Sequence, residues 1–257
     1  MGKIQRVNVN GTITGYGENI GGITGSNIGE YAAKSEMGYI AADGNKNNEI
    51  NCTITGEGNN AGGAVGLNSG IIGDGAIVQG GNFKITGNYN VGGFIGKDIS
   101  VGGTENAMIG QVSQLVNNTG IEAKAGNAGG IIGSAEGSGF MLAGCENNGE
   151  IKASTGNAGG ITAFNNEGNT VYNCTNTANI TAPKAESNGA IVGTNYGRIS
   201  NCFLGSDKGV FGLKDKILLN GNRYLGGIAG ENGDNAEIID TVINLSLIHI
   251  SEPTRPI

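Results

Sequence analysis

The chain has 257 residues, of which 51 are glycine and only 5% are aromatic, so it has too few large side chains to fill the core of an ordinary globular domain. The 15 Lys and Arg against 22 Asp and Glu give a net charge of −7, without the cluster of basic residues that binding to a nucleic acid requires. The 3 prolines and the irregular glycine spacing exclude collagen. No stretch approaches the ~18 apolar residues of a membrane span, so we expect no membrane insertion.

A Gly-Gly-apolar-x-Gly core recurs seven times, with small variations. Its copies begin at Gly21, Gly62, Gly92, Gly129, Gly159, Gly189 and Gly226. Successive copies are 41, 30, 37, 30, 30 and 37 residues apart, so the basic period is 30 residues with insertions in three repeats. A fixed period of this length is typical of solenoids. We assign structural roles to Gly22, Ile23, Gly63, Gly93, Gly130, Ile131, Gly160, Ile161, Ile191, Gly227 and Ile228.

Each repeat contains two further short apolar elements. One is an isoleucine before the core, at Ile13, Ile54, Ile85, Ile121, Ile151, Ile180 and Ile217. The other follows the core, as in Val171-Tyr172-Asn173-Cys174. Short β-branched stretches between Gly and Asn clusters are typical of strands separated by turns, because both turn residues tolerate positive φ. No helical periodicity is sustained.

Three strands and three turns in 30 residues predict one coil of a parallel β-helix. A single coil buries too little to be stable, because each buried Ile or Val contributes only roughly 1.5–3 kcal/mol against the entropy of ordering the whole coil. Stacked coils pair their backbones about 4.8 Å apart and continue one internal ladder of isoleucines. We therefore predict an all-β, right-handed parallel β-helix of about seven coils with loop insertions.

The cysteines have no zinc-binding spacing, and the only histidine lies near the C-terminus, so we predict no metal site. Cys145, Cys174 and Cys202 occupy similar positions in neighbouring repeats. We predict that they form a buried column of small apolar side chains. A disulfide between adjacent coils is the alternative, since it needs Cα atoms about 5.5–6 Å apart.

A hydrolase or lyase site on a β-helix would need carboxylates or basic residues gathered on adjacent coils. The position after the second-element isoleucine holds Thr14, Thr55, Thr86, Glu122, Lys152, Thr181 and Leu218. Its single Glu and Lys favour a surface ion pair over a catalytic set. We therefore predict that the chain is not an enzyme, with no catalytic residues and no cofactor.

Binding residues are commonly added to a solenoid in loops that bulge from it. The insertions lie near 31–48, 97–113 and 206–216, and their aromatic residues Tyr31, Tyr39 and Phe211 are the candidate ligand contacts. Insertions that bind nothing are the alternative.

The copies Gly130-Ile131-Ile132-Gly133, Ala190-Ile191-Val192-Gly193 and Gly227-Ile228-Ala229-Gly230 resemble the GLUG-motif repeat. The resemblance covers roughly residues 4–244, with departures at Ala163 and in the insertions. That family occurs in large extracellular bacterial proteins, including adhesin-like chains and non-catalytic regions of immunoglobulin A1 peptidases. The resemblance implies secretion and surface display, a spacer or binding role, and a surface protein or glycan as partner; the family defines no catalytic residues.

The last 24 residues contain no glycine, and residues 245–257 are similar to a translated sequencing adapter. We therefore expect a repeat domain over 1–244 and a non-native or disordered tail over 245–257. The repeat domain is expected to be a structural or adhesive segment of a larger extracellular or cell-surface protein. A non-catalytic arm of a surface metallopeptidase and a polysaccharide-active β-helix enzyme are the alternatives. Uncapped end coils predict self-association, because they expose strand edges.

Overall fold

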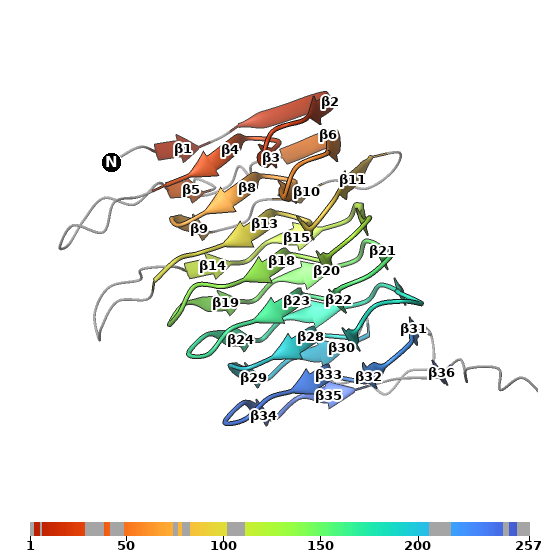
Figure 1. Ribbon diagram of the computed structural model, residues 1–257. Coiled ribbons are helices and arrows are strands. Elements are labelled where there is room, and N and C mark those ends of the chain that lie inside the picture. Colours follow the sequence, from red (N-terminus) through yellow and green to blue (C-terminus); the bar gives the residue numbers. More distant parts are fainter. Residues whose placement is uncertain are drawn as a thin grey trace, which may run out of the picture.

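The computed structural model describes residues 3–5, 7–28, 39–41, 49–73, 77–78, 83–101, 111–205, 217–243 and 247–250. Every secondary-structure element assigned in these ranges is a β-strand, and the strands pair in parallel. They form four sheets that run along a common axis, and within each sheet the strands of successive coils lie side by side (Figure 1). The predicted all-β parallel β-helix is therefore confirmed.

We name the sheets A to D. Sheet A contains β1 (Lys3–Gln5), β5 (Tyr39–Ala41), β9 (Ile71–Gly73), β14 (Gln111–Ser113), β19 (Met141–Ala143), β24 (Thr170–Tyr172), β29 (Arg198–Ser200) and β34 (Glu237–Ile239). Sheet C contains β3 (Asn19–Gly21), β7 (Asn60–Gly62), β12 (Asn90–Gly92), β17 (Asn127–Gly129), β22 (Asn157–Gly159), β27 (Ser187–Gly189) and β32 (Tyr224–Gly226). Sheet D contains β4 (Thr24–Asn27), β8 (Val65–Asn68), β13 (Ile95–Asp98), β18 (Ile132–Ala135), β23 (Thr162–Asn165), β28 (Val192–Asn195) and β33 (Ala229–Asn232).

Sheet B is the widest, with 14 strands. It starts with two long strands, β2 (Asn8–Gly15) and β6 (Glu49–Gly56). Later coils divide this strand in two. The first half forms β10 (Ile77–Val78), β15 (Val116–Asn117), β20 (Glu146–Asn147), β25 (Thr175–Asn176), β30 (Phe203–Leu204) and β35 (Val242–Ile243). The second half forms β11 (Lys84–Gly87), β16 (Gly120–Ala123), β21 (Ile151–Ala153), β26 (Ile180–Thr181), β31 (Leu218–Gly221) and β36 (Leu247–Ile250).

The prediction of three strands per coil was wrong, because a complete coil such as β16 to β20 contains five short strands on four sheets. The pattern Val171–Cys174 predicts one strand, but Asn173 has a φ of 50° and turns the chain from sheet A into sheet B. The same left-handed corner recurs in four other coils where this corner is described, at Gln114, Gly144, Asn201 and Asp240. Asparagine and glycine suit it because they adopt positive φ with little strain.

The Gly-Gly pair forms the corner between sheets C and D. The first glycines of all seven copies stack in register, from Gly21 on Gly62 to Gly189 on Gly226. Positive φ does not explain this pair. A Cβ on Gly129 would lie 1.9 Å from the carbonyl oxygen of Ile132, and a Cβ on Gly130 would lie 2.1 Å from that of Gly160. Close backbone approach therefore requires glycine at the corner.

Columns of aliphatic side chains fill the interior. One column consists of Ile54, Ile85, Ile121, Ile151, Ile180 and Leu219, all at most 1% exposed. Leu219, and not Ile217, pairs with Ile180, so the prediction of Ile217 was wrong by two residues. Ile217 is also buried, because residues two apart in a strand face the same side. The apolar pattern alone therefore fits either register.

The apolar residue after each Gly-Gly pair also points inward. Ile131, Ile161 and Ile191 are at most 1% exposed, whereas Ile23 and Ile228 in the first and last repeats are only partly buried. A coil within the stack is covered on both sides, and an end coil in the described stack is covered on one side. Stacking therefore supplies the burial that a single coil lacks.

Part of the C-terminal tail joins the stack. Leu247–Ile250 forms β36, whose backbone pairs in parallel with Leu218–Gly221 of β31. Residues 245–246 and 251–257 lie outside the described residues. The described segments include no helix that is long and apolar enough to cross a bilayer.

Candidate functional site

The candidate contact residues in the insertions are only partly covered by the structure. Tyr31 and Phe211 lie outside the described residues. Tyr39 begins β5, where its backbone pairs with Lys3 and Ile71, so this part of the first insertion is a regular strand of sheet A. The second insertion is also shorter than predicted, because residues 97–98 belong to β13 and residues 111–113 to β14.

The three predicted column cysteines stack directly. The backbone amide of Thr175 donates to the carbonyl of Cys145, and that of Phe203 donates to the carbonyl of Cys174, which places the cysteines on adjacent coils. Cys145, Cys174 and Cys202 are buried with free thiols, as is Cys52 in β6.

Burial raises the pKa of the Cys174 thiol well above its ordinary value, helped by its contact with Cys145. The hydrogen bond with Cys174, together with burial, raises the pKa of Cys202. Because the thiolate is the nucleophile and the metal ligand, these neutral thiols are suited to packing rather than to chemistry. Among the residues that the structure describes, no three His, Cys, Asp or Glu side chains gather to hold a metal ion.

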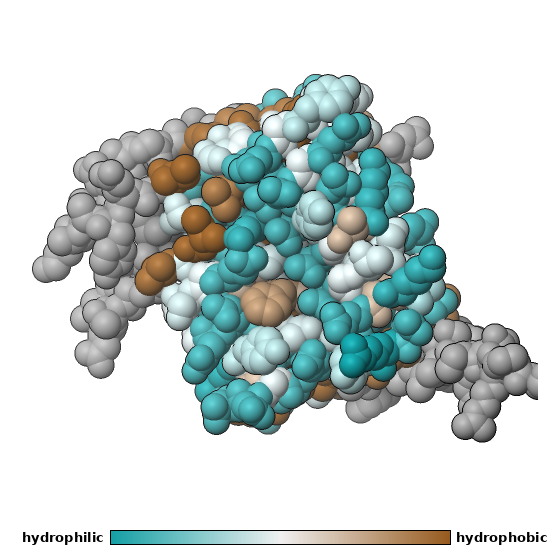
Figure 2. Space-filling model, viewed as in Figure 1, coloured by the Kyte–Doolittle hydropathy of each residue, from teal (hydrophilic) through white to brown (hydrophobic). Residues whose placement is uncertain are grey.

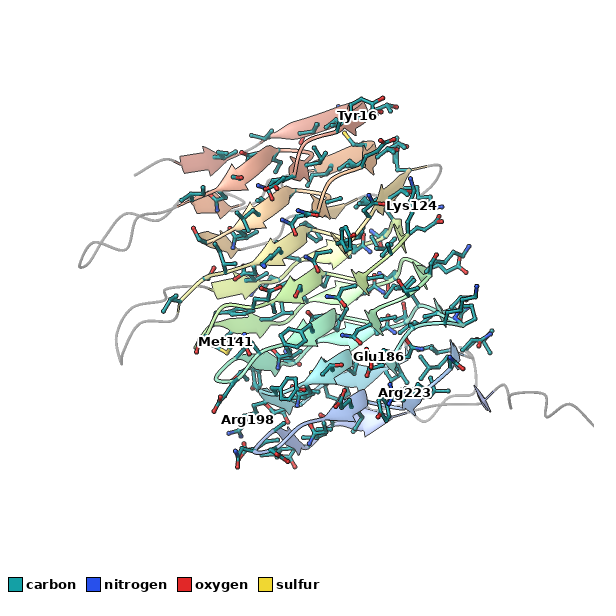
Figure 3. The ribbon with its side chains drawn as sticks, viewed as in Figure 1. Tyr16, Lys124, Met141, Glu186, Arg198 and Arg223 are labelled. Atoms are coloured by element: carbon teal, nitrogen blue, oxygen red, sulfur yellow. The ribbon has the colours of Figure 1, made fainter. Side chains whose placement is uncertain are left out.

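Exposed ion pairs connect neighbouring coils. The predicted pair of Glu122 with Lys152 is not formed: Glu122 pairs with Lys84 of the preceding coil, and Lys152 pairs with Glu150 at 3.0 Å. Arg223 and Glu186, labelled in Figure 3, form a similar pair at 3.2 Å with both side chains over 60% exposed. Pairs this exposed contribute little to stability.

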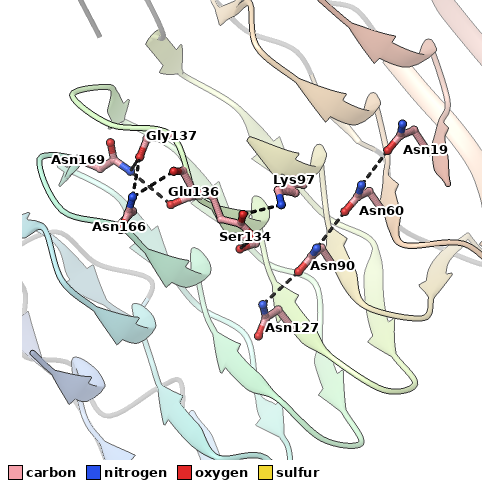
Figure 4. Close-up of polar contacts among 11 residues, drawn as sticks. Asn19, Asn60, Asn90, Lys97, Asn127, Ser134, Glu136, Gly137, Asn166 and Asn169 are labelled. Carbon is pink, nitrogen blue, oxygen red and sulfur yellow. Dashed lines mark hydrogen bonds and ion pairs between the residues drawn. The ribbon is translucent and has the colours of Figure 1, made fainter. Parts of the chain in front are cut away.

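Asparagine side chains at the first position of successive sheet C strands form an amide ladder. We define the groove ladder as Asn19, Asn60, Asn90 and Asn127. Each Nδ2 donates to the Oδ1 of the preceding coil's asparagine, at 2.7 Å for Asn60, 2.9 Å for Asn90 and 3.1 Å for Asn127 (Figure 4). The backbone amide of Asn157 continues the row by donating to Oδ1 of Asn127 at 3.2 Å.

The groove ladder is the floor of an open groove of about 530 Å³ that crosses four coils. Leu67, Lys97 and Ile99 line one wall, from strand β8 and from β13 and the residue after it. Glu18, Asn59, Tyr89 and Gly126, each just before a strand of sheet C, line the other. Figure 2 shows that this face of the molecule is largely hydrophilic.

The groove carries little charge. Among the described lining residues, Lys97 is the one cation and Glu18 the one carboxylate. The Nζ of Lys97 lies 2.5 Å from Oε2 of Glu136 on the next coil (Figure 4). With the lysine already paired, the groove offers amides, one exposed tyrosine and short apolar walls, and no cation for an anionic ligand.

A second hollow, of about 360 Å³, lies farther along the stack. Its lining includes Glu167, Tyr196, Arg198 and Glu237. Arg198 and Glu237 are half exposed and form an ion pair at 3.5 Å. An exposed, paired carboxylate differs from the buried, apolar setting that makes a carboxyl group a general acid.

Two further amide ladders are buried. Along sheet B, Asn117 donates to Asn147 at 2.7 Å, and Asn147 donates to Asn176 at 2.9 Å. Along sheet D, Asn27 donates to Asn68, and Asn165 donates to Asn195. Each buried Asn can satisfy both the next coil and its own turn, because one amide has two donors and one acceptor oxygen with two lone pairs.

Asp98 interrupts the sheet D ladder. It is 0% exposed; its Oδ2 accepts from Nδ2 of Asn68 at 2.6 Å and its Oδ1 accepts from the amide of Ser100 at 2.9 Å. Ala135 occupies the next ladder position. Burial raises the pKa of Asp98 to about 6, although these hydrogen bonds oppose the rise.

We expect Asp98 to make the protein less stable as pH rises. Between an unfolded-state pKa of about 3.9 and a folded-state pKa of about 6, the native state keeps a proton that the unfolded chain has lost. This contribution to the free energy of unfolding is complete below about pH 4 and is lost as pH rises through about 6, by about 3 kcal/mol. Urea denaturation from pH 4 to pH 7 measures it.

Asp98→Asn is expected to remove this pH dependence and to raise stability at pH 7. Asn176 is the precedent, because its Oδ1 accepts from Asn147 of the preceding coil and its amide group bonds the backbone of Ala178 in its own turn. Its pairing residue in the next coil is Leu204, just as Ala135 is the pairing residue of Asp98. Asp234→Asn, at an exposed position, is the control and should keep the wild-type slope. Equal slopes in wild type and Asp98→Asn would contradict the assignment.

The groove was not predicted, because the asparagines of the repeat were interpreted only as turn residues. The signal is present: an asparagine stands two positions before the first core glycine in the first five repeats, as in Asn90-Val91-Gly92. Stacking in register then places these amides on one another. The wall residues Glu18, Asn59, Tyr89 and Gly126 carry no such signal, since they stand at equivalent positions of the repeat but share no residue type.

Comparison of this chain with protein-family models, curated proteins and solved structures finds no match. The GLUG resemblance and its implications therefore stay predictions.

Proposed function

We propose that the chain is a non-catalytic structural and adhesive repeat segment of a larger secreted or cell-surface bacterial protein. The observation that carries this proposal is the amide-lined groove, which crosses four stacked coils. Surface location rests on the GLUG resemblance.

Coil geometry favours a binding surface over a spacer. The chain uses 30 residues from Gly129 to Gly159 to advance by one strand spacing, about 4.8 Å. A helix of the same length would span about 45 Å. A solenoid is thus a poor way to gain length and a good way to hold equivalent side chains in fixed rows.

Pairing and burial of the reactive groups support a non-catalytic role. Among the described residues, Glu122, Glu136, Glu186 and Glu237 have cationic partners on neighbouring coils. The carboxylate with the most strongly perturbed pKa, that of Asp98, is inaccessible to a substrate because it is 0% exposed.

Bead retention tests the proposal. The purified chain is immobilised and incubated separately with soluble mannan, heparin, gelatin and duplex DNA, with bare beads as the control. We expect retention of a polysaccharide or protein probe, eluted at unchanged molecular size, and no retention of DNA. Loss of all probes in the wash would contradict an adhesive role. Shortened polysaccharide or protein in the eluate would contradict a non-catalytic one.

A further inference from the structure

We propose that the groove over sheets C and D binds a neutral glycan chain that lies along the solenoid axis. This inference rests on the proposed adhesive function and adds the ligand class and its site. The predicted contact residues of the insertions take no part in it.

The groove ladder supplies a repeated pattern of polar groups. The amide of Asn90 uses one N–H to bond Asn60 and its oxygen to accept from Asn127. One N–H and one lone pair then remain for a ligand. A hydroxyl group both donates and accepts, so it complements that pair, and a ligand with hydroxyls along its length can repeat the match on successive coils about 4.8 Å apart.

Tyr89 supplies the apolar part of the site. It stands on the groove wall directly before Asn90, and 51% of its surface is exposed. Gly126 lies beside it on the next coil; a Cβ there would be 2.4 Å from the Tyr89 carbonyl oxygen. Glycine is therefore required there by close backbone approach, and the exposed half of the Tyr89 side chain is what a ligand can contact. An aromatic ring beside polar groups fits a sugar, whose C–H face is apolar and whose rim carries hydroxyls.

Charge argues against anionic ligands. Lys97 is held by Glu136, and Glu18 adds a negative charge to the opposite wall. A phosphate, sulfate or uronate chain would find no unpaired cation among the lining residues and would be repelled by Glu18. A neutral chain meets neither obstacle.

Backbone pairing argues against an added peptide strand. The amide of Asn60 donates to the carbonyl of Glu18 at 2.7 Å, and that of Asn90 donates to Asn59 at 2.8 Å. Strand addition needs a free sheet edge, and along the groove these groups already bond the neighbouring coil. Side-chain amides, rather than backbone, are what the groove presents.

Affinity electrophoresis of the whole chain through gels that contain mannan, dextran or heparin tests the proposal. We expect a neutral polysaccharide to retard the wild type, with retardation insensitive to salt because no ion pair is formed. Tyr89→Ala should weaken binding about tenfold through loss of the stacking surface. The matched control is Tyr172→Ala, a 41%-exposed tyrosine on sheet A, which should bind like the wild type.

The side-chain NH₂ resonances of Asn90 and Asn127 locate the site, and we expect them to shift when the retarding polysaccharide is titrated in. Equal affinity of the two tyrosine variants would overturn the site, as would unshifted asparagine resonances. Retardation by heparin alone, or bead retention of gelatin alone, would overturn the neutral glycan while leaving the adhesive function standing. Retention of no probe in either assay would overturn both.

Discussion

Gly129→Ala is expected to destabilise the fold by about 3 kcal/mol or more. The new Cβ would lie 1.9 Å from the carbonyl oxygen of Ile132 and 3.0 Å from the amide nitrogen of Ala163 on the next coil. The first contact is inside the same corner, so moving a neighbouring coil cannot relieve it. Overpacking against side chains typically costs about 1–3 kcal/mol, and backbone atoms yield less readily. Urea unfolding followed by circular dichroism measures the loss.

Gly120→Ala is the matched control, because Gly120 lies in β16 of the same coil and the nearest atom to its new Cβ is 3.9 Å away. We expect a change within about 0.5 kcal/mol, as for a substitution without a specific contact. Equal losses in the two variants would contradict close approach as the reason for glycine at the corner, because Gly→Ala without a clash otherwise stabilises by restricting the unfolded chain.

Repetition explains why the coil register was predictable. Each core copy carries the same Gly-Gly pair, and parallel stacking places equivalent residues on one another, so the alignment of Gly21, Gly62 and Gly92 follows from spacing alone. The repeat period and the buried isoleucines were predictable in the same way, because burial requires that each coil pack against the next.

Features with no apolar signal were not predictable. The left-handed turn at Asn173 divides an apolar stretch without changing its pattern, so one predicted strand became two. The choice between Ile217 and Leu219 depends on two aliphatic residues that share one face. The candidate site differs from the predicted one for a further reason. The position of a loop can be identified in the sequence, whereas the wall of the groove is formed jointly by residues of several coils.

Asparagine ladders show that polar stacking complements the aliphatic columns, and Asn147→Ala measures their contribution. Asn147 is 0% exposed. Its Oδ1 accepts from Asn117 at 2.7 Å and from the amide of Gly149 at 3.3 Å; its Nδ2 donates to Asn176 at 2.9 Å and to the Gly149 carbonyl at 3.1 Å. We expect a loss of about 3–5 kcal/mol in the free energy of unfolding, because each bond contributes about 1 kcal/mol and Gly149 loses partners in a buried turn.

Asn148→Ala is the control for this effect. Asn148 is the adjacent residue and the same residue type, but it is exposed and bonds Asn118 and Glu146 at the surface. We expect its removal to change the free energy of unfolding by less than about 0.5 kcal/mol, since water replaces the lost partners. If the two alanine variants unfold at the same urea concentration, the buried amides contribute no more to stability than surface ones, and backbone pairing with the aliphatic columns accounts for the stacking of the coils.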